Sequence, residues 1–113
     1  MTLRKELGKI VDVKLGTGGY QGAMFGLTVH IETKSGAAFC FSGYWANRPK
    51  DAEWTKEFQN EKFLGVILKI KNLMLDAKLS DFKDLKGVPV EVVWDSGQNP
   101  PTLESFRILK EVI

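Results

Sequence analysis

The feature that most constrains the fold is a long stretch with helical periodicity, set between regions that alternate like strands. From about residue 52 to residue 79 there is no proline and only one glycine, Gly65. Apolar residues recur there at alternating spacings of four and three, and so form one stripe along an α-helix: Phe63, Ile67, Ile70, Met74 and Ala77. Leucines at 64, 68, 75 and 79 widen the stripe. The sequence therefore predicts one helix with a face broad enough to lie on a sheet.

Polar residues typical of helix ends flank this stretch. Asp51 follows Pro49, which is unsuited to a strand interior, and we expect Asp51 to be the N-cap. Acidic residues occupy the first half and lysines the second half, the order that the helix dipole favours: Glu53, Glu57, Glu61, Lys69, Lys71 and Lys78. We interpret these charges as a solvated surface.

Outside the helix, five segments alternate with the period of two that is typical of half-buried strands: 8–15, 24–33, 37–45, 88–94 and 102–113. Lys34, Ser35 and Gly36 predict a tight hairpin, and residues 80–87 predict a short capped turn closed by glycine. We therefore predict a single α+β domain over 1–113. Its mostly antiparallel sheet of about five strands follows the order β-β-β-α-β-β, with the helix packed on one face.

A glycine-rich segment, GTGGYQG at 16–22, follows the first predicted strand. It matches neither standard phosphate-loop spacing, and a strand rather than a helix follows it. One interpretation is a hinge or wide turn that needs several flexible residues. The other is an anion-binding loop, in which Gly18 and Gly19 offer N–H groups while Tyr20 and Gln21 contact a ligand.

A second cluster, GYWANR, occupies residues 43–48 at the end of the third predicted strand. Adjacent Tyr44 and Trp45 cannot both face the core of an alternating strand, so one of them either covers a neighbouring element or contacts a ligand. Arg48 and Arg107 are two of three arginines in a chain with 16 basic residues, and either residue suits phosphate binding.

The sequence contains no recognisable catalytic or metal-binding motif. His30 is the only histidine and Cys40 the only cysteine, so no zinc cluster and no internal disulfide is predicted. We interpret His30 as a surface residue and Cys40 as a small buried apolar residue. The sequence predicts no enzyme and no cofactor. No apolar run reaches the roughly 20 residues that span a bilayer, so we expect a cytoplasmic protein without a membrane partner.

In the segments GTGGYQGAMFGLTVHI and LESFRILKEVI, the chain resembles a widespread group of small uncharacterised proteins of tailed bacteriophages and prophages. The matching residues are Gly18, Gly19, Tyr20, Gln21, Gly26, Leu27, Gly43, Trp45, Arg107, Ile108 and Leu109. This resemblance implies a phage origin, an infected bacterial cell as the location and no particular activity.

Small non-catalytic phage proteins often antagonise host defence by binding. Our leading hypothesis is that this chain sequesters a small nucleotide signal through Gly18, Gly19, Tyr20, Gln21, Trp45, Arg48 and Arg107. The alternatives are an inhibitor that binds a host defence protein, in the manner of an anti-CRISPR, and an accessory protein of phage replication that binds single strands. The net charge of only +2 makes nucleic acid an unlikely partner. Twelve aromatic residues exceed what one helix on a sheet requires, so we expect a homo-oligomer.

Overall fold

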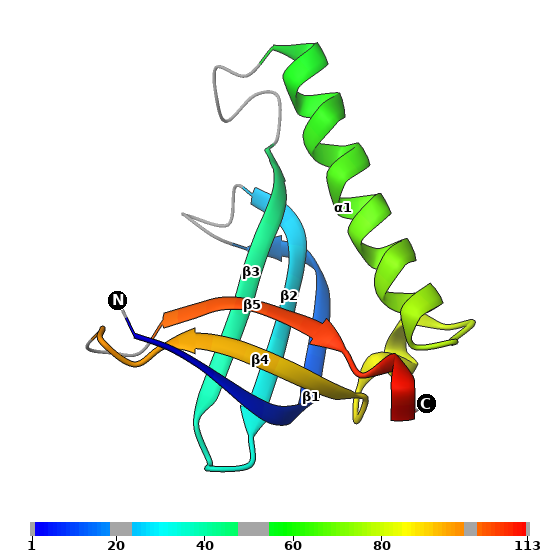
Figure 1. Ribbon diagram of the computed structural model, residues 1–113. Helices are drawn as coiled ribbons and strands as arrows, with labels where there is room; N and C mark the ends of the chain where they lie inside the picture. Colours follow the sequence, from blue (N-terminus) through cyan, green and yellow to red (C-terminus); the bar gives the residue numbers. More distant parts are fainter. Residues whose placement is uncertain (1, 19–23, 48–54, 99–101, 113) are drawn as a thin grey trace.

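One curled antiparallel sheet forms the body of the protein, and a single long helix runs along its side (Figure 1). This computed structural model describes residues 2–18, 24–47, 55–98 and 102–112, and for residues 18, 24 and 42–47 it describes the backbone alone. In chain order the elements are β1 (Leu3–Gly18), β2 (Met24–Thr33), β3 (Ala38–Asn47), α1 (Lys56–Asp76), η2 (Phe82–Leu85), β4 (Pro89–Asp95), β5 (Thr102–Ile108) and η3 (Lys110–Val112), where η is a short 3₁₀ turn. The predicted α+β class and order of elements are confirmed.

The longest strand, β1, joins the two halves of the sheet. The strand order is β3-β2-β1-β4-β5, and each neighbouring pair is antiparallel. Residues 8–18 of β1 pair with β2, whereas residues 3–9 pair with β4. Only Gly8 and Lys9 have register partners on both sides, and the register with β2 shifts between Ile10 and Asp12. Such a bulge bends a strand and increases its twist, so β1 turns from one half of the sheet into the other.

The curl brings the two edge strands toward each other. The rings of Phe41 in β3 and Phe106 in β5 meet edge to face, with centroids 5.3 Å apart. The strand order, the sharing of β1 and the helix between the third and fourth strands resemble the arrangement of the oligonucleotide/oligosaccharide-binding (OB) fold.

The core fills the inside of this curl. Its buried strand residues alternate with exposed neighbours, as the period-two pattern predicts, and include Ile10, Leu27, Val29, Ile31, Phe39, Val90, Val92 and Ile108. The helix contributes Leu73, Ala77 follows it as the C-cap, and η2 contributes Leu85. The end of α1 and the turn after it therefore close one opening of the curled sheet.

The helix begins later than the sequence predicts. Thr55 is the N-cap, and its Oγ1 accepts a hydrogen bond from the Phe58 backbone N–H at 3.1 Å. The predicted cap, Asp51, lies outside the described residues. At the other end, Ala77 is the C-cap and Lys78 adopts a left-handed φ of 58°. The helix is therefore shorter at both ends than residues 52–79.

The buried face of the helix matches the predicted stripe only in part, since Ala77 is buried and Met74 is half-buried as predicted. Val66 and Leu73 are its buried residues, whereas Phe63 is 42% exposed and Ile67 is 54% exposed. Ile70 is partly buried against the core. The curled sheet offers the helix a narrow contact surface, formed mainly by β3, so only one part of the broad apolar face is covered.

The turns follow the sequence closely, although some strand ends differ. Gly36 in the hairpin and Gly87 after η2 have φ values of +90° and +93°, which glycine adopts without strain. The first strand is longer than residues 8–15, and the last ends at Ile108 instead of continuing to 113. The prediction that Cys40 is buried is wrong, because its side chain is exposed on the outer face of β3.

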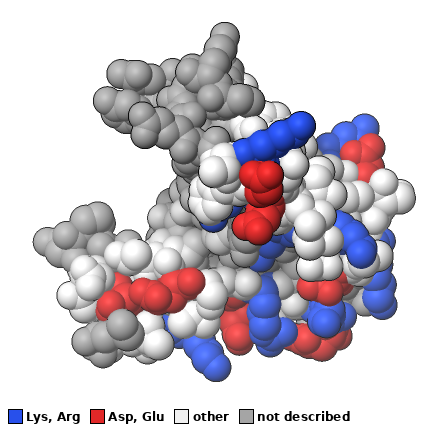
Figure 2. All heavy atoms as spheres, turned by 90° about the horizontal axis from the view of Figure 1, so that it is seen from above, with Lys and Arg blue, Asp and Glu red and all other residues white. Residues whose placement is uncertain are grey.

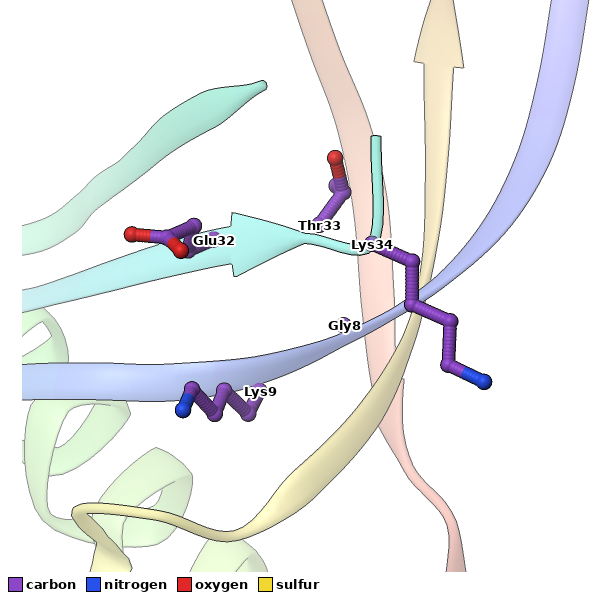
Figure 3. Close-up of a pocket in the computed structure, with 5 residues that line it drawn as sticks. All are labelled: Gly8, Lys9, Glu32, Thr33 and Lys34. Atoms are coloured by element: carbon purple, nitrogen blue, oxygen red, sulfur yellow. The ribbon is translucent and has the colours of Figure 1, made fainter. Parts of the chain in front are cut away.

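Gly8 lies where β1 passes closest to the end of β2, beside Thr33 and Lys34 (Figure 3). A Cβ atom at this position would lie 2.7 Å from the backbone oxygen of Glu32, which is closer than real Cβ contacts allow. Only glycine is therefore accommodated at this position, where β1 pairs with β2 on one side and with β4 on the other.

We predict that Leu73→Ala destabilises the protein by about 2–5 kcal/mol, since it leaves a cavity in the core. Leu75 is two residues away on the same helix but is 63% exposed, compared with 4% for Leu73. Leu75→Ala should therefore change the free energy of unfolding of the single subunit, measured at low protein concentration, by less than about 0.5 kcal/mol. Chemical denaturation of both variants measures the difference. Equal losses would show that α1 does not pack on the sheet through Leu73.

We also predict that Gly8→Ala destabilises the protein by about 1–3 kcal/mol, because the added methyl group forces β1 and β2 apart. Gly16→Ala, in the same strand, is the matched control, since the nearest atom to its Cβ would be the Lys14 side-chain Cε at 4.0 Å. Thermal unfolding should show a lower Tm for the first variant alone. A Gly8→Ala protein as stable as the parent would contradict the close approach.

Candidate functional site

The two segments singled out in the sequence meet at one end of the sheet. Gly18, the last residue of β1, pairs with Met24 at the start of β2, and Met24 pairs with Asn47 at the end of β3. One step further into the sheet, Thr17 pairs with Phe25, which pairs with Ala46. The glycine-rich segment and the aromatic segment therefore leave the sheet from adjacent strand ends, which we call the loop end.

The described part of the predicted site consists mainly of backbone. Gly18 ends β1, and Trp45 belongs to β3, where its backbone places it two residues before Asn47. Gly19, Tyr20, Gln21 and Arg48 lie outside the described residues. Gly16, Thr17 and Gly18 are part of β1, so the first three residues of the predicted seven-residue loop belong to a strand.

An aromatic pair stands beside the loop end. The rings of Phe25 in β2 and Phe63 in α1 stack with centroids 5.5 Å apart and an interplanar angle of 24°. The sequence assigns Phe63 to the apolar stripe of the helix, and Phe25 lies within the strand predicted over 24–33. Their meeting could not be read there, because it depends on where the helix crosses the sheet. The pair gives the loop end an apolar wall.

Arg107, also predicted for the site, lies elsewhere. Its Nε is 3.2 Å from Oε1 of Glu91, its register partner in β4, and one of its terminal nitrogens is 3.2 Å from a carboxylate oxygen of Glu111. The hydrogen bond with Glu91 is the main cause that raises the pKa of Arg107 above its ordinary value. The guanidinium therefore serves two carboxylates of its own chain.

The position of Arg107 along the sheet also separates it from the loop end. Its neighbour Phe106 contacts Phe41, which lies six residues before Asn47 in β3. Six residues of extended strand correspond to about 20 Å. The structure thus brings Gly18 and Trp45 toward one end of the sheet and leaves Arg107 away from it.

The outer face of β1, β2 and β3 carries a mixture of polar groups. In one row Asp12 pairs with His30 and His30 with Cys40, and in the next Lys14 pairs with Thr28. Seen from the loop end, lysines and arginines alternate with acidic residues over the described surface, without a large area of one sign (Figure 2). The interpretation of His30 as a surface residue is confirmed.

A shallow pocket of about 340 Å³ lies beside Gly8 (Figure 3). Lys9 and Glu32, which are register partners, line it with opposite charges, while the Lys34 side chain extends away from them. Thr33 Oγ1 already accepts the Ala37 N–H at 3.1 Å. The Thr33 hydroxyl is thus engaged in closing the hairpin.

A wider groove of about 600 Å³ lies between the start of β1, the hairpin and the end of β4. Arg4 Nε donates to Ser96 Oγ at 3.2 Å, and the Ser35 N–H donates to the Glu6 carboxylate at 2.8 Å. Hydrogen bonding by Ser35 lowers the pKa of Glu6. The Trp94 indole N–H is buried, and its interaction with the Glu6 carboxylate also lowers the pKa of that group. These contacts tie three distant segments together and so have a structural role.

The described residues include neither a metal site nor a membrane-spanning helix. No group of three or more His, Cys, Asp or Glu side chains there could hold a metal ion. No helix in the same part of the chain is long and apolar enough to cross a membrane.

Comparison of the chain with protein-family models, with curated proteins and with solved structures finds no match. The candidate site at the loop end therefore rests on the chain's own residues and on the register of its strands.

Asp95, beside the groove, generates a prediction about pH. Its buried carboxylate accepts hydrogen bonds from the backbone N–H groups of Thr2 at 3.1 Å and Gly97 at 2.9 Å, and these bonds lower its pKa. A lowered pKa in the folded state means that the stabilisation is present above the ordinary aspartate value of about 3.9 and is lost as the pH falls below it.

We therefore predict that Asp95→Asn lowers the Tm at pH 7 and that the difference from the parent shrinks as the pH falls below about 4. Thermal unfolding from pH 7 to below this value measures the effect. Asp12→Asn, on the exposed outer face, removes the same charge and should follow the parent's profile. A difference between parent and Asp95→Asn that stays constant with pH would show that the carboxylate's charge is unimportant.

Proposed function

We propose that this chain is a non-catalytic binding protein that holds a small nucleotide-type ligand at the loop end. The supporting observation is the register from Gly18 through Met24 to Asn47, which joins the glycine-rich and aromatic segments. N–H groups of Gly18 and Gly19, with Arg48, would bind phosphates. Tyr20 or Trp45 would stack on a base, and Gln21 would contact its polar edge. Arg107 is left out, since its charge is already compensated.

The resemblance to the OB-fold supports the location. In that fold the ligand lies on strands two and three and on the loop between strands one and two, and here that loop is the glycine-rich segment. A fold by itself does not set a function, because the chemistry belongs to the residues placed on it. The proposal therefore depends on the side chains that follow β1 and β3.

The mixed outer face favours a small ligand over a long single strand. A protein that tracks a strand needs a continuous basic groove with stacking platforms. The described outer rows instead place Asp12 and Glu32 among Lys14 and His30. A mononucleotide or a cyclic dinucleotide would require only the loop end.

The resemblance to phage proteins supports a role in infection. A phage protein that binds a nucleotide without converting it can lower the concentration of a host immune signal. We therefore propose sequestration of such a signal as the role. The runner-up roles, inhibition of a host defence protein and binding of single strands, predict different responses in the experiment below.

The test is ligand-induced stabilisation of the purified protein. ADP-ribose, cyclic ADP-ribose and cyclic di-GMP serve as probes. A further sample is prepared by incubating the protein with a lysate of defence-activated cells, repurifying it and denaturing it with heat, which releases any bound small molecule. A ligand that binds only the folded state at 100 times its Kd stabilises that state by about 2.7 kcal/mol. We expect one of these samples to raise the Tm, and mass spectrometry of the heat-denatured sample identifies the molecule released.

With the ligand that raises the Tm, Tyr20→Ala should weaken affinity roughly ten- to a hundredfold, because stacking on an aromatic ring contributes about 1–3 kcal/mol. Arg48→Ala should weaken it comparably, and Arg48→Lys only in part, since lysine lacks the planar fork. Arg107→Ala is the control and should bind like the parent. A protein that releases no small molecule but retains a host protein, or that binds oligonucleotides with a steep salt dependence, would contradict the proposal.

A further inference from the structure

A second apolar stripe on α1 faces away from the sheet. Leu64 is 57% exposed and Leu68 is 42% exposed, and Leu75 continues the same line. One helical residue turns the side chain by about 100°, so a residue two positions from the buried Val66 or Leu73 lies on nearly the opposite side of the helix. Figure 1 shows this side of α1 with no other described element against it. The stripe is therefore open on the isolated subunit.

The stripe belongs to a longer line with the spacing of a coiled-coil seam. Residues at alternating intervals of four and three define the α1 seam: Glu57, Glu61, Leu64, Leu68, Lys71 and Leu75. A repeat of 3.5 residues keeps one line of side chains facing a partner helix. The helix has 21 residues and so provides three heptads, about 31 Å in length. Ile67, which is also exposed, widens the seam on one side.

The charges of the α1 seam are ordered along the helix. Glu57 and Glu61 occupy its first part, and Lys71 lies in its last part, with leucines between and after them. Neither glutamate forms an ion pair within the described chain. Two parallel copies would oppose like charges, whereas two antiparallel copies would oppose Glu61 of each copy to Lys71 of the other. The seam is therefore complementary to itself under a two-fold axis.

We propose that α1 forms the interface of an antiparallel two-fold homodimer, in which the α1 seams of two copies pack against each other. Near the axis, Leu64 of each copy meets the partner's Leu68, and Glu61 faces the partner's Lys71. The aliphatic stem of Lys71 covers leucine while its ammonium group reaches the carboxylate or solvent. This arrangement would cover the stripe that the narrow sheet contact leaves open.

Light scattering between about 1 and 100 µM tests the dimer, because association follows mass action. We expect the parent to have twice the monomer mass of 12.7 kDa. Leu64→Gln should weaken dimerisation at least tenfold without lowering the Tm of the monomer, since Leu64 is outside the core and glutamine keeps the helix propensity. Glu61→Lys should act similarly, whereas Glu104→Lys, the same change of charge on the exposed edge of β5, should leave the dimer intact.

Mixing separates this interface from a general effect of charge. The Glu61→Lys variant carries only lysines at the facing positions 61 and 71, and a Lys71→Glu variant carries only glutamates there. Each alone should be monomeric, and an equimolar mixture should form a heterodimer. A parent that is monomeric throughout, a Leu64→Gln variant that still dimerises like the parent, or a mixture that stays monomeric would each overturn the proposal. The proposal would also be overturned if the parent were monomeric and bound a different protein through the same leucines.

Discussion

The rest of the structure depends on the double pairing of β1. Its first half is bonded to β4 and its second half to β2, and the two sets of partners overlap only at Gly8 and Lys9. A Cβ atom at Gly8 would lie 2.7 Å from the backbone oxygen of Glu32, so glycine is required at this position. The bulge just after it bends the strand. Together they curl the sheet until Phe41 and Phe106 meet across its edges, and this curl encloses the core.

The curl also decides how much of the helix is used. A flat sheet would cover a broad apolar face, but the curled one accepts the end of α1 near Leu73 and a line along β3. The long apolar pattern therefore divides into a buried stripe and an exposed one. The ordered charges beside the exposed leucines, which in the sequence look like ordinary solvated residues, become the feature that favours a second copy of the chain as the partner.

The candidate site shows how far sequence reasoning reaches. The glycine-rich and aromatic segments were chosen for their residue types, and the register of β1, β2 and β3 then placed their strand ends side by side. Arg107 was chosen because arginine is scarce in the chain, which says nothing about its neighbours. Glu91 is its cross-strand partner, so this ion pair depends on the pairing of β4 with β5. Glu111 lies four residues after Arg107, and this second ion pair forms across the end of β5.

What the sequence by itself determined is local: the type and order of the elements, the turn glycines Gly36 and Gly87, and the inward faces of the strands. These follow from backbone conformation and from periodicities of two and 3.6 residues, which involve only near neighbours. Tertiary structure alone decided the stacking of Phe25 on Phe63 and the helix face that is buried. Both depend on where segments distant in sequence meet, which the bend of β1 helps to set, and no local period encodes that bend.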